Sequence, residues 1–187
     1  MKRLFIGIDI SADARRRAAS YVEELRRTAG DLRVGWERPE KLHVTLKFLG
    51  DVPETRLGLL EAALGMAAAE IGSYIASLSG TGYFPPRGFP RVLWLGVDDQ
   101  GETARVSSSL ENELAGRGYP REIREFSPHL TIGRLREPER SRKLAEIHLQ
   151  KKFEPINFKV SELVLYESSL QPSGSIHTRL QTFPLKD

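Results

Sequence analysis

The sequence contains no cysteine among its 187 residues. This absence excludes disulfides, thiol nucleophiles and zinc sites built on cysteine. The sequence also lacks any apolar run close to the ~20 residues that a membrane-spanning helix needs. The apolar stretch at the N-terminus ends at Asp9 and is too short for a signal peptide. We therefore expect a protein of the reducing cytoplasm.

A strong excess of charge of either sign is missing as well. Lys and Arg number 28 against 25 Asp and Glu, which leaves a net charge of +3. This balance allows modest attraction to a polyanion but is not the charge of a histone-like polycation. The length and an apolar content of 40% suit one domain, or two small lobes, with a substantial core.

Histidine is scarce, yet two of the four histidines occur in the same short motif, His-apolar-Thr-apolar. Side chains two apart in a β-strand face the same side. His43 therefore shares a face with Thr45, and His129 shares a face with Thr131. The apolar residues around both motifs are predicted to face the core: Leu42, Val44, Leu46, Phe48, Leu130 and Ile132. Two such strands side by side would place two imidazoles and two hydroxyls in one groove.

The rest of the chain alternates irregularly between predicted strands and helices. Strands are expected over residues 3–10, 32–36, 74–83 and 91–97, helices over 11–28, 53–72, 102–115 and 138–150, and a hairpin over 156–166 and 175–185 with its tip at 172–174. This pattern is typical of an α+β fold with mostly antiparallel sheets. The repeated motif suggests an old duplication with two lobes facing each other across a cleft. We expect one compact bilobal domain over residues 1–187.

Two histidines facing one phosphorus atom can divide the proton transfers of hydrolysis. One takes a proton from the attacking water, and the other gives a proton to the departing sugar oxygen. Imidazole suits both roles because its reference pKa, about 6.5, lies near working pH. Threonine hydroxyls can donate hydrogen bonds to the phosphate oxygens, where charge accumulates. The sequence has no His-Glu-x-x-His motif and no cluster of carboxylates, and Asp98 and Asp99 are interpreted as a turn. We expect neither a metal nor another cofactor.

Both motifs, with their surroundings at residues 42–50 and 126–134, resemble those of the 2H phosphoesterase superfamily. Within it the chain is similar to the LigT-type RNA 2′,3′-cyclic phosphodiesterases, formerly called 2′-5′ RNA ligases. The likeness extends over nearly the whole chain and includes residues 5–8, 91–96 and 165–168. It implies two pseudo-symmetric lobes of mostly antiparallel sheet with helices outside and the His-x-Thr strands lining a central groove.

The resemblance also implies a reaction. Water attacks the phosphorus of a 2′,3′-cyclic phosphate, the 3′ oxygen leaves, and a 2′-phosphomonoester remains. By the same resemblance, His129 is the base and His43 the acid, assignments that the spacing of the motifs does not supply. Thr45 and Thr131 are expected to bind the phosphate.

Arg134 occupies a position that binds phosphate in the resembled family, and a guanidinium suits phosphate oxygens. Strict alternation would point Arg134 away from His129, so we expect a bulge or bend at Gly133 to re-aim it. Phe84 and Phe89 flank a proline-rich loop and are candidates for stacking on a nucleobase. His148 is expected at the surface of a helix, whereas His177 is a candidate for lining the groove.

Two other functions remain open at this point. A 2′-5′ RNA ligase would catalyse the chemical reverse with the same two histidines in exchanged roles. A non-catalytic module that binds RNA ends would keep the groove without needing either histidine for turnover. For the enzyme we expect RNA ends or small cyclic nucleotides as substrates, no membrane partner and a monomeric state.

Overall fold

The protein was analysed as a computed structural model, which describes residues 1–171 and 174–187. In chain order the elements are β1 (Lys2–Asp9), α1 (Ala12–Ala29), β2 (Val34–Trp36), β3 (His43–Val52), α2 (Leu57–Ala69), β4 (Tyr74–Phe84), β5 (Val92–Asp98), α3 (Glu102–Ala115), β6 (His129–Leu135), α4 (Arg142–Gln150), β7 (Ile156–Val160), β8 (Glu162–Gln171) and β9 (Gly174–Pro184). Within these two ranges, no helix combines the length and the apolar character needed to cross a membrane.

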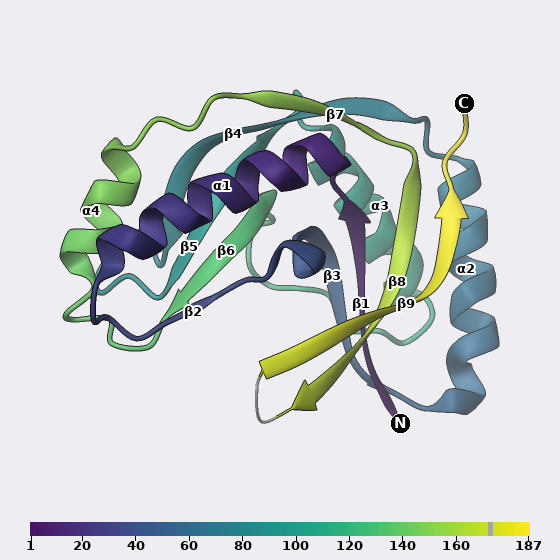
Figure 1. The fold of residues 1–187 in the computed structure, drawn as a ribbon. Helices are drawn as coiled ribbons and strands as arrows, with labels where there is room; N and C mark the ends of the chain where they lie inside the picture. The colour runs from purple at the N-terminus through teal and green to yellow at the C-terminus, as the bar shows by residue number, and fades with distance from the viewer. Residues whose placement is uncertain (172–173) are drawn as a thin grey trace.

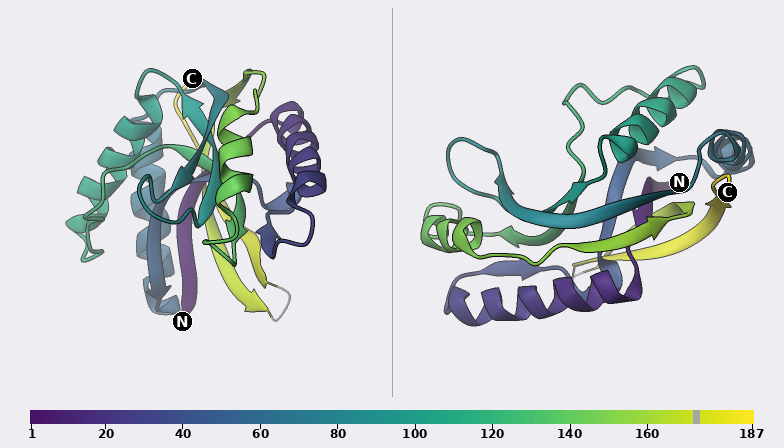
Figure 2. Two further views of the ribbon diagram at one scale, coloured as in Figure 1. Left: turned by 90° about the vertical axis from the view of Figure 1, so that its left-hand side faces the viewer. Right: turned by 90° about the horizontal axis from the view of Figure 1, so that it is seen from above.

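The strands form one curled antiparallel sheet in the order β7-β4-β5-β6-β3-β1-β8-β9, and β2 pairs with β6 (Figure 1). Helices α1 and α4 pack on the lobe that contains β4 and β7, and α2 and α3 pack on the lobe that contains β3, β8 and β9. The view from above shows α1 and α3 on opposite sides of the sheet (Figure 2). The α+β class and the two lobes with helices outside are as the sequence predicts.

The lobes do not coincide with the two halves of the chain. Strands β1 and β3, from the N-terminal half, share a lobe with the C-terminal hairpin of β8 and β9. The predicted continuous strand 156–166 is wrong for this reason. Residues 156–160 pair with β4 in one lobe, and the chain then crosses to pair with β1 in the other. Local propensity cannot reveal this crossing, because both segments are apolar and strand-like.

Helix α1 forms as its sequence dictates. The Ser11 hydroxyl caps it by accepting a hydrogen bond from the Ala14 amide at 3.2 Å. Apolar residues recur on one face and are buried in the core: Ala14, Ala18, Val22 and Leu25. Helix α4 is shorter than predicted, because residues 138–141 form turns before it. The predicted hairpin tip includes Pro172 and Ser173, which lie outside the described residues.

The two lobes meet where β3 runs antiparallel to β6. Val44 is paired with Leu130 at this junction, and both side chains are fully buried. The junction therefore places the two His-x-Thr strands side by side at the centre of the sheet.

Candidate active site

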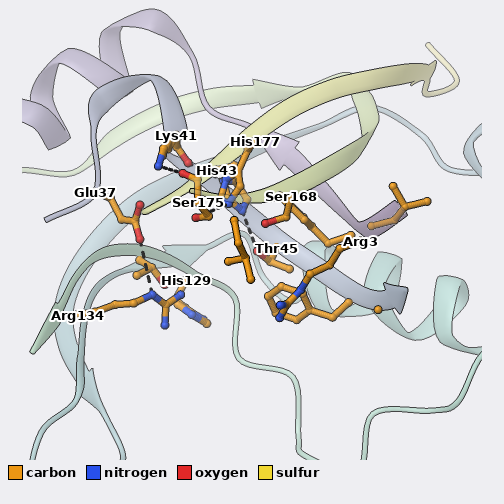
Figure 3. Close-up of a pocket in the computed structure, with 16 residues that line it drawn as sticks. Arg3, Glu37, Lys41, His43, Thr45, His129, Arg134, Ser168, Ser175 and His177 are labelled. Carbon is orange, nitrogen blue, oxygen red and sulfur yellow. Dashed lines mark hydrogen bonds and ion pairs between the residues drawn. The ribbon is translucent and has the colours of Figure 1, made fainter. Parts of the chain in front are cut away.

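The pairing of Val44 with Leu130 fixes how the two motifs face each other. Continuing this antiparallel register by one residue in each direction brings His43 alongside Thr131 and Thr45 alongside His129. The two histidines are then diagonal neighbours on one face, a relation in which Cα atoms lie about 7–8 Å apart. All four side chains line a groove of about 420 Å³ (Figure 3). The prediction that both imidazoles and both hydroxyls share one groove is confirmed.

The His43 imidazole is held by the backbone just before it. Its Nδ1–H donates to the Lys41 carbonyl at 2.6 Å, so Nε2 is the nitrogen available for chemistry. Nε2 lies 3.0 Å from the Thr45 hydroxyl oxygen. Burial lowers the pKa of His43, while the Lys41 carbonyl and the Asp9 carboxylate oppose this shift.

Aromatic rings enclose the same imidazole. The ring centroids of Phe5, Tyr166 and His177 lie 4.8, 5.4 and 5.1 Å from that of His43. Gly7 allows the close approach, since a Cβ atom there would lie 2.8 Å from the Val44 carbonyl oxygen and 3.4 Å from the His43 ring. This packing fixes the ring orientation of His43.

The His129 imidazole has the same backbone anchor but different neighbours. Its Nδ1–H donates to the Ser127 carbonyl at 2.7 Å, and Nε2 has no hydrogen-bond partner in the described part of the chain. The Phe84 ring packs edge-on against it, with centroids 5.0 Å apart. Burial lowers the pKa of His129, and the nearby charge of Arg134 lowers it further. The imidazole is therefore neutral near pH 7, with a free lone pair.

Arg134 reaches the groove through an irregularity in β6. Leu93 of β5 pairs with Gly133, but the next residue pairs with Thr131, so Ile132 is skipped. Ile132 and Gly133 are both buried, and Arg134 then faces the groove with half of its side chain exposed. The expected re-aiming at Gly133 is thus confirmed. The Arg134 guanidinium lies 3.7 Å from the Glu37 carboxylate, and its role in binding phosphate stays a prediction.

Phe48 does not face the core, so that prediction is wrong. The β1–β3 register shifts between Ile6 and Gly7, where Leu46 is skipped, and this shift reverses the alternation at Lys47 and Phe48. A second shift, between Leu4 and Phe5, restores the alternation beyond Leu49. Phe48 lines the groove and is 65% exposed. Sequence reasoning missed it because a regular strand pattern gives no sign of these bulges.

Lys47, which the bulge turns inward, is buried instead. Its ammonium group donates to the Pro120 carbonyl at 2.8 Å and lies 2.7 Å from the Glu111 carboxylate. These two partners satisfy a charge that would otherwise be costly inside the protein.

The remaining histidines differ from each other. His148, predicted at the surface, is fully buried: its Nδ1 bonds the Tyr21 hydroxyl at 2.9 Å, and its Nε2 bonds the carbonyls of Gly82 and Trp94. The prediction of a surface position is wrong because α4 turns this side chain toward the sheet, where polar groups form hydrogen bonds with it. His177 does line the groove, and burial, together with the charges of His43, Lys41 and Arg134, lowers its pKa to about 4.

The two aromatic residues proposed to stack on a base, Phe84 and Phe89, are not among the described residues that line the groove. Phe84 contacts His129 and Trp94, and Phe89 lies under the Arg142 guanidinium at 5.3 Å. Their stacking on a base remains a prediction, and Phe48 is the exposed aromatic side chain that the groove offers.

Asp98 is the last residue of β5, and the predicted turn begins at Asp99. The Asp99 carboxylate accepts hydrogen bonds from the backbone amides of Gly101 and Thr103, both at 3.0 Å, and so satisfies an amide in the first turn of α3. Across the residues that the structure describes, no three or more His, Asp or Glu side chains are grouped to hold a metal ion.

Comparison with known proteins places this geometry in a family. Residues 13–171 match the model of the 2′-5′ RNA ligase superfamily. The chain is 35% identical to the RNA 2′,3′-cyclic phosphodiesterase of Methanothermobacter thermautotrophicus, over 98% of each protein. It is 33% identical to the protein of that name from Thermotoga maritima, over 94% of this chain and 91% of the relative.

Solved structures show the same fold. The protein TT0787 of Thermus thermophilus superposes with a TM-score of 0.79 at 27% identity, over 98% of both chains. The E. coli LigT structure in apo form superposes with a TM-score of 0.76 at 24% identity, over 100% of this chain and 98% of that one. Sequence, site geometry and fold agree, and the chain belongs to the 2′-5′ RNA ligase superfamily.

Proposed function

We propose that this protein hydrolyses RNA 2′,3′-cyclic phosphate ends to 2′-phosphomonoesters, by acid–base catalysis from His43 and His129 and without a metal. The observation that carries the proposal is the pair of imidazoles in one groove, each anchored through Nδ1 to a backbone carbonyl. Both therefore present Nε2 for proton transfer. The relatives named RNA 2′,3′-cyclic phosphodiesterase support the choice of substrate.

His129 is the general base in this proposal. The Ser127 carbonyl holds the proton on Nδ1, so the neutral ring keeps its lone pair on Nε2, where no described residue competes for it. Burial and Arg134 both lower the pKa of His129 and favour this neutral form. His129 takes a proton from water as the water oxygen bonds to phosphorus.

His43 is the general acid. Its charged form has a carboxylate nearby, since Asp9 lies opposite it in the β1–β3 pairing and raises its pKa against the effect of burial. As the bond between phosphorus and the 3′ oxygen breaks, the Nε2 proton passes to that oxygen. The products are a 3′ hydroxyl and a 2′-phosphomonoester. After the reaction His129 is protonated and His43 is neutral.

The charge on the phosphate oxygens needs donors in the transition state. Thr45 and Thr131 flank the two imidazoles on the same face, and their hydroxyls are in place to donate. Arg134 adds a guanidinium whose approach to Glu37 orients it along the groove. Two proton carriers and three donor groups account for the chemistry without a Lewis acid.

The test is hydrolysis of an RNA oligonucleotide with a 2′,3′-cyclic end in the presence of EDTA, with the product isomer identified. We expect a 2′-phosphomonoester, formed as fast with EDTA as without it. A 3′-phosphomonoester, or activity that EDTA abolishes and a divalent metal restores, would contradict the proposal.

The rival functions give different results in the same assay. Addition of an RNA with a 5′-hydroxyl end yields a joined 2′-5′ product if the ligase reaction dominates. Tight binding of the cyclic end with no turnover indicates a binding module.

A further inference from the structure

Three cations line the groove among the described residues, and they differ in what they contact. Arg134 lies 3.7 Å from Glu37, and the Lys41 ammonium donates to the Ser175 carbonyl. The Arg3 side chain forms neither an ion pair nor a hydrogen bond with any residue that the structure describes, although the backbone of Arg3 is paired in the sheet. Its guanidinium therefore keeps all of its donors free for a ligand.

Arg3 lies at the end of the groove opposite to Arg134. In β1 it is two residues from Phe5 and shares its face, and Phe5 is paired with Phe48 of β3. Continuing the β1–β8 register by one residue beyond Leu4 and Glu167 brings Arg3 alongside Ser168, whose hydroxyl also lines the groove. Figure 3 shows Arg3 and Ser168 on the far side of His43 and Thr45 from Glu37 and Arg134.

Asp51, the cross-strand neighbour of Arg3, does not neutralise it. The two residues are paired through β1 and β3, yet their charged groups are not within ion-pair distance. Along β3 the Phe48 side chain, 65% exposed, lies between the position paired with Arg3 and Thr45, and Leu170, 73% exposed, also lines the groove. The groove thus has a cation at each end and an exposed aromatic side chain between them.

An RNA terminus has a matching distribution of charge. The last ribose carries the cyclic phosphate on its 2′ and 3′ oxygens and the next phosphate of the chain on its 5′ oxygen, so the sugar separates the two phosphates and the base extends from its 1′ carbon. We propose that Arg3, assisted by Ser168, forms a second phosphate subsite, which binds the phosphate 5′ to the terminal nucleoside. This inference rests on the proposed function. It implies that an RNA end, whose terminal nucleoside carries a 5′ phosphate, is a better substrate than a nucleoside 2′,3′-cyclic phosphate without one.

The experiment compares adenosine 2′,3′-cyclic phosphate with the same compound carrying a 5′-phosphate. A free guanidinium that gains a phosphate partner should raise kcat/KM for the 5′-phosphorylated substrate about tenfold, through a lower KM. Added salt should reduce this advantage. Arg3→Met should bring the ratio of the two substrates close to one, whereas Arg3→Lys should keep part of it.

Arg16→Met is the matched control, because Arg16 lies on α1, is exposed and pairs only with Asp13 among the described residues. This variant should keep the wild-type ratio. Equal kcat/KM for the two substrates in the wild type, or a ratio that survives Arg3→Met, would overturn the subsite. A change in the preference between adenosine and guanosine cyclic phosphates in Arg3→Met, with the 5′-phosphate ratio intact, would also overturn it and assign Arg3 to a base edge.

Binding separates this inference from the proposed function. Calorimetry should show adenosine 2′,5′-bisphosphate binding about tenfold more tightly than adenosine 2′-phosphate, and Arg3→Met should remove the difference. If that difference is found but no cyclic phosphate is hydrolysed, the subsite stands and the proposed function fails. If cyclic phosphates are hydrolysed but the two ligands bind equally, the subsite alone fails.

Discussion

The two His-x-Thr strands carry the same motif but lie in different surroundings. On β3 the His43 ring is enclosed by aromatic side chains and has the Asp9 carboxylate nearby. On β6 the His129 ring is beside the Arg134 guanidinium, and its Nε2 is free of hydrogen bonds to described residues. Burial and Arg134 lower the pKa of both imidazoles, but at His43 the Asp9 carboxylate opposes the shift and favours the charged form. A symmetric motif can therefore supply an acid on one strand and a base on the other.

Removal of either imidazole should cause the largest loss of activity. Positioned proton transfer contributes about 10²–10⁴ in rate, or roughly 3–5 kcal/mol per group. His43→Ala and His129→Ala should each lose kcat on that scale while unfolding at temperatures close to that of the wild type. The double variant should lose less than the product of the two losses, because groups that act as a unit are non-additive. Full activity of either single variant on a cyclic RNA end would end the two-histidine account.

A smaller effect is expected on the β6 side from Arg134→Ala. Its guanidinium should contact the phosphate in both ground and transition states, so KM should rise about tenfold with a lesser fall in kcat. Steady-state kinetics on a 2′,3′-cyclic nucleotide measures both constants. Arg136→Ala, which alters an exposed arginine just beyond β6, serves as the control and should leave KM within about twofold. Unchanged kinetics for Arg134→Ala would remove Arg134 from the site.

The smallest effect is expected on the β3 side from Asp9→Asn. The wild-type rate should follow a bell against pH, because His129 must be neutral and His43 charged. Asp9 raises the pKa of His43, so loss of its charge should lower that pKa and move the alkaline limb of kcat/KM toward lower pH. Asn can still accept the Tyr166 hydrogen bond that Asp9 receives. The rate should fall a few-fold above neutral pH and stay nearly unchanged on the acid limb. Movement of the acid limb instead would assign Asp9 to the base.

Local sequence patterns were enough to find the centre of the site, because period-two alternation alone pairs each histidine with its threonine. The glycine at position 133 also correctly predicted the irregularity that turns Arg134 into the groove. Phe48 and His148 were placed wrongly for a common reason. A bulge in β3 and the packing of α4 on the sheet depend on residues distant in sequence, and no local pattern records them. The crossing between β7 and β8 escaped prediction on the same grounds.

The most direct test of the division of labour uses a cyclic phosphate in which sulfur replaces the 3′ oxygen. A departing thiolate needs little help from an acid, so the acid variant should recover on this substrate and the base variant should not. We predict that His43→Ala hydrolyses the 3′-thio substrate within about tenfold of the wild-type rate, while His129→Ala remains slower by at least about 10². Equal impairment of both variants, or recovery of His129→Ala alone, would contradict the assignment of acid to β3 and base to β6.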